Sequence, residues 1–173
     1  MHILCRLSAA LLLGAVSAMP AQAQDCPWLA TSVIDQAFPE QAPWDVMAGG
    51  QGRCKFSSDA SRPHSNISLT QIVHDSPAAA EQYAKTVAGG MAKAGYVVAP
   101  LPALGKEGAA VRQNQADSRM LTLVGHRGAI VVMTQMSFFG GVDAAGQGIA
   151  EKLTLDTFDK DTGGGLVLPK AKP

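Results

Sequence analysis

Apolar and polar side chains alternate along residues 66–74. The apolar set on one face of this segment comprises Ile67, Leu69 and Val73. A period of two is the side-chain period of a β-strand that turns one face toward a core. We therefore predict a strand over residues 66–74.

The second half of the chain contains further strand-like segments. Residues 120–124 and 129–137 are rich in β-branched and other apolar side chains, and they predict the two strongest strands. The Gly-His-Arg-Gly segment 125–128 between them predicts a hairpin connection. Shorter strands are predicted over residues 52–56, 96–99 and 109–115.

Three other segments carry apolar side chains at helical spacing, over residues 27–38, 76–95 and about 143–158. Ser76 is a favourable N-cap and Pro77 suits the first helical turn, so the second helix has a clear start. Gly89-Gly90 interrupts that helix, which predicts either close packing or a kink.

This order of elements predicts the fold class. Clustered strands joined by short turns favour a largely antiparallel sheet, packed by two to three helices in a single α+β domain over residues 24–160. Residues 39–52 are rich in Pro and Gly and are predicted to form a loop. Residues 161–173 contain three successive glycines and are predicted to form a flexible C-terminal tail.

The first 23 residues resemble a bacterial export signal. Arg6 is followed by an apolar run over residues 7–18 and by Ala21-Gln22-Ala23, the small-x-small pattern of a cleavage site. The run is shorter than the roughly 20 apolar residues that span a bilayer. We predict a cleaved signal peptide over residues 1–23, a periplasmic or secreted mature protein, and no membrane anchor after cleavage.

Charge and cysteine content agree with this compartment. Without the signal, 13 basic and 14 acidic side chains remain, a balance that favours neither nucleic acid nor an anionic membrane surface as partner. Cys26 and Cys54 would be the remaining cysteines, and in an oxidising compartment they predict a disulfide.

Common catalytic signatures are missing from the sequence, including His-Glu-x-x-His, Gly-x-Ser-x-Gly, Ser-x-x-Lys and a P-loop. We therefore expect no catalytic residue and no cofactor.

The glycines of segment 49–52 lack the Lys-Ser/Thr pair of a phosphate loop, and they favour a connector. The acidic group comprises Glu151, Asp156, Asp159 and Asp161, whose spacing fails the calcium-loop pattern and is typical of a solvated helix face.

Histidine and methionine provide the candidate metal ligands. The histidines of the mature chain are His64, His74 and His126, and none has metal-ligand spacing to another. We expect solvated histidines, unless the fold brings them together. Three methionines on the predicted hairpin could bind Cu(I), but core packing is the expected role of Met120, Met133 and Met136.

Phe138 and Phe139 precede two glycines directly after a predicted strand. Together they could form an apolar protrusion that contacts a partner. The alternative is that one ring completes the core while the glycines turn the chain into the last helix. Phe138 and Phe139 are therefore the candidate partner contacts of this chain.

The Gly52-x-Cys54-x-Phe56 strand and the Leu101-Pro-x-Leu-Gly105 segment resemble parts of small exported bacterial proteins with a PsbP-like α/β sandwich. This resemblance implies a non-enzymatic accessory or binding module. The expected function is therefore a protein-binding module of the bacterial envelope, with an inhibitor-type protein as a special case. The alternatives are a periplasmic carrier of a small ligand or metal, and an enzyme whose site is dispersed along the sequence.

Overall fold

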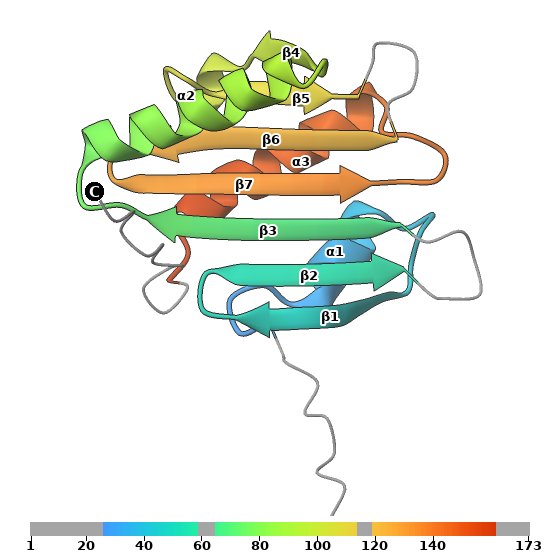
Figure 1. Cartoon of the computed structure of the whole chain (residues 1–173). Helices are drawn as coiled ribbons and strands as arrows, with labels where there is room; N and C mark the ends of the chain where they lie inside the picture. Colours follow the sequence, from blue (N-terminus) through green and yellow to red (C-terminus); the bar gives the residue numbers. More distant parts are fainter. Residues whose placement is uncertain (1–25, 59–64, 114–118, 162–173) are drawn as a thin grey trace, which may run out of the picture.

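The computed structural model describes residues 26–58, 65–113 and 119–161. Within these ranges the chain forms three α-helices, one short 3-10 helix and seven strands (Figure 1). In chain order they are α1 (Thr31–Ala37), β1 (Trp44–Gly50), β2 (Arg53–Ser58), β3 (Asn66–Val73), α2 (Pro77–Lys93), β4 (Val97–Pro100), η1 (Pro102–Leu104), β5 (Ala109–Arg112), β6 (Met120–Arg127), β7 (Ile130–Ser137) and α3 (Ala144–Phe158). The predicted signal peptide and all but the first residue of the predicted tail lie outside the described residues.

The described strands form one antiparallel sheet in the order β1-β2-β3-β7-β6-β5-β4. After β3 the chain crosses through α2 to the far edge of the sheet, and β5, β6 and β7 then return to the centre beside β3. This arrangement confirms the predicted α+β class, with a largely antiparallel sheet packed by helices.

Helices lie on both faces of the sheet. Figure 1 shows α2 in front of the half formed by β4 to β7, and α1 and α3 behind the sheet. The buried cluster between the sheet and α1 and α3 includes Phe56, Leu69 and Leu123. A smaller cluster under α2 includes Ala80 and Val124. The helices therefore cover two apolar layers, one on each face of the sheet, and α1 and α3 share one of them.

The alternation predicted for residues 66–74 is confirmed in β3. Ile67 and Leu69 are fully buried on the side of α3, whereas Ser68 and Thr70 are half-buried on the opposite face. The predicted start of α2 is confirmed as well, because the Ser76 hydroxyl accepts a hydrogen bond of 3.2 Å from the Ala79 amide.

The Gly89-Gly90 pair does not mark close packing. A Cβ atom built at either glycine would meet nothing within 4 Å, and α2 continues to Lys93. Of the two explanations predicted for this pair, the structure therefore rules out close packing.

The prediction of a loop over residues 39–52 is wrong in its second half, where β1 forms. Trp44 is 2% exposed, and β1 pairs with β2 along its length, with an irregularity in register at Met47. An edge strand is paired on one side only, and a bulge tolerates a break in the alternation. The composition of this segment is that of a loop, and β1 forms because pairing with β2 stabilises it.

The hairpin connection also lies later than predicted. β6 continues to Arg127 and β7 begins at Ile130, so the turn consists of Gly128 and Ala129. Gly128 has φ +56°, a conformation that glycine adopts without steric cost. Residues 125–127 therefore lie in the ladder between β6 and β7.

Cys26 and Cys54 form the predicted disulfide, with a Cα–Cα distance of 5.6 Å. Cys54 is fully buried on β2, whereas Cys26 lies just before α1. The bridge therefore attaches the segment that leads into α1 to the sheet.

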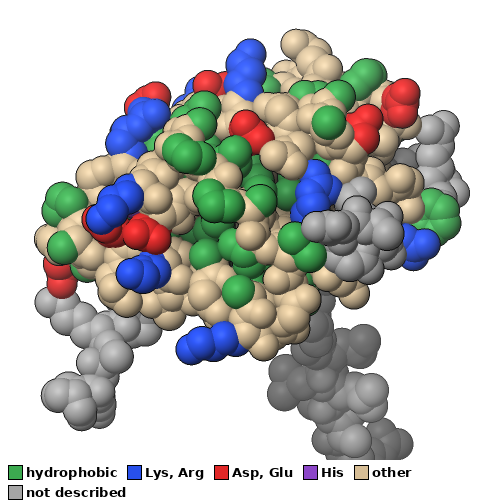
Figure 2. Space-filling view, turned by 90° about the horizontal axis from the view of Figure 1, so that it is seen from above, with side chains coloured by type: hydrophobic (Ala, Val, Ile, Leu, Met, Phe, Trp, Pro, Cys, Tyr) green, Lys and Arg blue, Asp and Glu red, His purple; other side chains and the backbone are tan. Residues whose placement is uncertain are grey.

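The surface seen from the β4 edge mixes both signs of charge. Figure 2 shows hydrophobic side chains in the middle of this face, with basic and acidic side chains interspersed around them. This distribution agrees with the near-neutral net charge of the chain.

Candidate functional site

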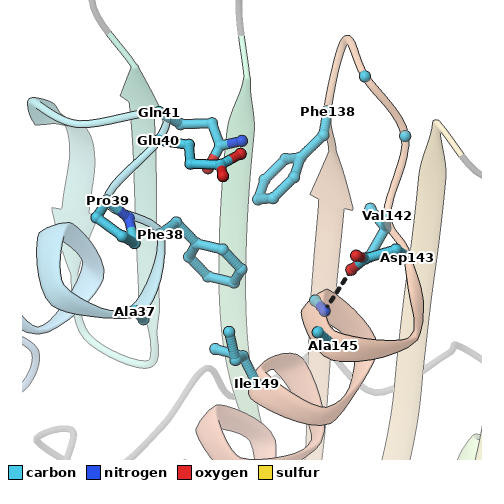
Figure 3. A pocket seen from close by; sticks show the side chains of 13 residues that line it. Ala37, Phe38, Pro39, Glu40, Gln41, Phe138, Val142, Asp143, Ala145 and Ile149 are labelled. Carbon is cyan, nitrogen blue, oxygen red and sulfur yellow. Dashed lines mark hydrogen bonds between the residues drawn. The ribbon is translucent and has the colours of Figure 1, made fainter.

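A cleft opens between the turn that follows α1 and the loop that joins β7 to α3. It encloses about 380 Å³ and is called the aromatic cleft below. Its lining residues are Ala37, Phe38, Pro39, Glu40, Gln41, Phe138, Gly140, Gly141, Val142, Asp143, Ala145, Gly146 and Ile149 (Figure 3). The two walls are about a hundred residues apart in sequence, so only the folded chain creates this site.

Three aromatic side chains pack together at the inner wall of the aromatic cleft. The rings of Phe38 and Phe138 meet edge to face, with centroids 5.0 Å apart and an interplanar angle of 89°. Trp44 lies 5.9 Å from the Phe138 ring, and its indole N–H donates to the Phe38 carbonyl at 3.3 Å. Edge-to-face packing and a satisfied indole hold this wall in one arrangement.

The mouth of the aromatic cleft is polar and acidic. Glu40 is exposed, and its carboxylate lies on the same side of the cleft as the Gln41 amide (Figure 3). Across the mouth, Asp143 caps α3 by accepting a hydrogen bond of 2.7 Å from the Gly146 amide. An apolar interior with carboxylates at its mouth suits an apolar side chain that is followed by a cation.

The two predicted partner contacts have different environments. Phe138 is 5% exposed and belongs to the aromatic wall, so its role is to shape the cleft from within. Phe139 is 63% exposed, and the Arg119 guanidinium lies 5.8 Å from its ring centroid. Aromatic and arginine side chains are enriched at protein–protein interfaces relative to the rest of the surface. Of the two phenylalanines, Phe139 is therefore the accessible candidate.

A second hollow lies beside the aromatic cleft, between α1 and α3. It encloses about 360 Å³ and shares Ala37 and Ile149 with the cleft. Its lining residues are Val33, Gln36, Ala37, Ile149, Lys152, Leu153 and Asp156, and we call it the α1–α3 groove. Val33 is 44% exposed at its edge. The cleft and the groove are therefore neighbouring hollows.

The two histidines within the described ranges, His74 and His126, are not grouped into a metal site. His64 lies outside the described residues. The His74 ring lies 5.0 Å from Tyr83, and His126 packs against Gly105. Neither side chain is fully solvated, contrary to expectation, because ring nitrogens of both are buried without a hydrogen-bond partner in the described structure. Among the residues described, no three His, Cys, Asp or Glu side chains are grouped to hold a metal ion.

The methionine candidates are separated by the sheet. Met136 is buried among the residues under α3, whereas Met133 packs against the cluster under α2. Met120 is 39% exposed at the start of β6. Side chains on opposite faces of a sheet cannot share one ion, so these three residues do not form a copper site together.

The remaining sequence candidates have structural roles. The glycines of segment 49–52 lie in the β1–β2 hairpin, where Gly52 has φ +69°. Glu151 accepts a hydrogen bond of 2.8 Å from Gln147, and Asp159 pairs with Arg127 at 2.8 Å. Asp156 lines the α1–α3 groove, which its sequence spacing did not indicate.

Sequence reasoning also missed Glu40 and Gln41 at the mouth of the cleft. Their only local signal is Pro39, which marks the end of a helix but says nothing about a facing loop.

No helix within the described ranges has the length and apolar character needed to cross a membrane. The resemblance to PsbP-like proteins stays a prediction. Comparisons with protein-family models, with curated proteins and with solved structures find no match for this chain.

Proposed function

We propose that the protein is an exported, non-enzymatic accessory module of the bacterial envelope that binds a partner protein at the aromatic cleft. The observation that carries this proposal is the cleft itself, with its aromatic wall, acidic mouth and neighbouring exposed Phe139. Export is supported by the signal-like first 23 residues and by the Cys26–Cys54 disulfide, which suits an oxidising compartment.

The chemistry of the cleft specifies the kind of partner segment. Its interior accepts one or two apolar side chains, and the Glu40 carboxylate at the mouth favours a lysine or arginine beside them. The Phe139 ring with Arg119 adds a flat contact outside the cleft. We therefore expect an extended peptide segment that carries apolar side chains followed by a basic one.

The test is an affinity pull-down from envelope extract, with the captured proteins identified by mass spectrometry. The wild-type protein should capture one dominant partner in stoichiometric amount, and Phe139→Ser should lose it. Met47→Ser is the matched control, because Met47 is 61% exposed on β1, outside the cleft lining. A folded Phe139→Ser protein that captures the same partner as wild type would refute this contact.

A carrier of a small apolar ligand is the second candidate. It is favoured by the volume of about 380 Å³, which falls in the range of small-molecule sites. Binding to the native state alone would raise the melting temperature in a screen of metabolites and metal ions. A clear shift without protein capture would favour this function over partner binding.

A further inference from the structure

The α1–α3 groove leaves apolar side chains exposed to solvent next to the aromatic cleft. Val33 on α1 is 44% exposed, and it lines the groove together with the partly buried Ile149 of α3. We propose that residues 166–172 of the same chain occupy this groove and reach the aromatic cleft. This would replace the flexible tail predicted from the sequence with a docked segment.

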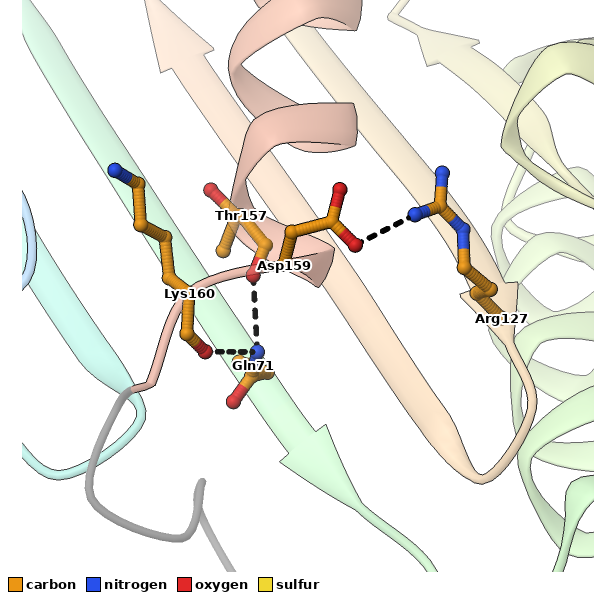
Figure 4. Close-up of polar contacts among 5 residues, drawn as sticks. All are labelled: Gln71, Arg127, Thr157, Asp159 and Lys160. Atoms are coloured by element: carbon orange, nitrogen blue, oxygen red, sulfur yellow. Dashed lines mark hydrogen bonds and ion pairs between the residues drawn. The ribbon is translucent and has the colours of Figure 1, made fainter.

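The first argument is the place where the described chain ends. The Gln71 side-chain amide donates to the carbonyls of Thr157 and Lys160, at 2.9 and 3.3 Å (Figure 4). Arg127 holds Asp159 at 2.8 Å in the same view. These contacts fix residue 160 directly after α3, within one or two turns of Asp156 at the end of the groove.

The second argument is reach. Residues 161 to 166 span at most about 17 Å when extended. The part of α3 between Asp156 and Ile149, which lines the groove, is only about 10 Å long. A segment that turns back along α3 therefore reaches every part of the groove, and glycines 163–165 place few restrictions on that reversal.

The third argument is the match of side chains. Leu166-Val167-Leu168 is an apolar triplet in a segment whose other residues are polar, glycine, proline or alanine. The exposed Val33 and the partly buried Ile149 offer it an apolar surface. Lys170 and Lys172 follow the triplet. The lining of the groove and the cleft contains three carboxylates against one lysine, namely Glu40, Asp143 and Asp156 against Lys152. Both polarity and charge are therefore complementary.

This arrangement has a functional consequence. Residues 166–172 have the sequence chemistry expected of the partner segment, which is apolar side chains followed by cations. The docked segment would therefore compete with a partner for the aromatic cleft. Occupancy of the groove is independent of the proposed function, whereas the competition rests on it.

The first experiment places a nitroxide on residue 171 of the exported chain through Ala171→Cys, because the Cys26–Cys54 disulfide leaves no other reactive thiol in the mature sequence. We expect loss of amide NMR intensity for the residues that line the groove and the cleft. A label at Lys85→Cys on α2, across the sheet, is the control and should spare those amides.

Intensity loss that falls on another surface, or on none, would overturn the proposal. Spin-labelled chains mixed with isotope-labelled chains detect transfer between molecules, and loss in that sample would assign the groove to a second copy instead. The triple change of Leu166, Val167 and Leu168 to serine should abolish the intramolecular effect.

The same triple variant separates this proposal from the proposed function. If the segment competes for the cleft, partner capture in the pull-down should rise in the triple variant, while Phe139→Ser still loses it. If the groove and cleft amides of the triple variant are unchanged and capture still depends on Phe139, the docked segment is refuted and the proposed binding function stands.

Discussion

Replacing Gln71 tests what holds the end of α3 to the sheet. Gln71 is 3% exposed on β3, and its amide donates to the Thr157 and Lys160 carbonyls. These carbonyls belong to the last turn of α3 and the residue beyond its cap, where a helix leaves acceptors without intrahelical partners. Gln71→Met keeps the length of the side chain and removes both donated hydrogen bonds.

The expected magnitude follows from these two hydrogen bonds. Each contributes about 0.5–1.5 kcal/mol, so Gln71→Met should lower the free energy of unfolding by roughly 1–3 kcal/mol. For a domain of this size that corresponds to a fall in melting temperature of about 3–12 °C. Gln71→Glu should cost more, because a buried carboxylate would face two carbonyl oxygens that it cannot donate to.

Urea unfolding followed by circular dichroism measures this loss. Gln82→Met is the matched control, since Gln82 is exposed on α2 and its side chain donates to Thr86 within the same helix. The stability of this variant should stay within about 0.5 kcal/mol of wild type. Hydrogen exchange should also show faster exchange at the end of α3 in Gln71→Met. Equal stability of Gln71→Met and wild type would refute the role assigned to this contact.

Three further predictions concern stability. Replacing both disulfide cysteines by serine should cost about 3–4 kcal/mol in urea unfolding, and the intact mass of the oxidised wild type should lie about 2 Da below its reduced form. Thr134 and Thr154 share a buried hydrogen bond of 2.7 Å, so Thr154→Val alone should cost about 1–3 kcal/mol, whereas adding Thr134→Val should recover part of that loss in the same assay. The Lys106 hydrogen bond lowers the pKa of Glu81, so this pair stabilises the fold above the unfolded pKa of Glu and loses that effect as pH falls through the folded value. In Lys106→Met, the melting temperature between about pH 3 and 6 should lack the pH dependence that this pair contributes. In wild type, 1 M salt should weaken that pH dependence.

The agreement between sequence and structure is best where the pattern is local. The alternation in β3 and the Ser76 cap of α2 are both read from neighbouring residues, and both are confirmed. β1 was missed because its Gly49-Gly50 pair and the nearby prolines have low strand propensity, while its stability comes from pairing with β2. Strand pairing is a contact between segments, so composition within one segment cannot show it.

The sequence by itself determined the α+β class, the central strands and the cysteine pair, and it indicated Phe138 and Phe139 together as candidate contacts without separating them. Each of these features depends on a short-range period or on residue chemistry, and both can be read without knowing the fold. Only the tertiary structure decided that Phe138 is buried against Phe38, and that Glu40 lies at the same cleft as Asp143. The reason is physical: a cleft is made by segments brought together through long-range packing, and side-chain spacing along one segment carries no record of which distant segment will face it.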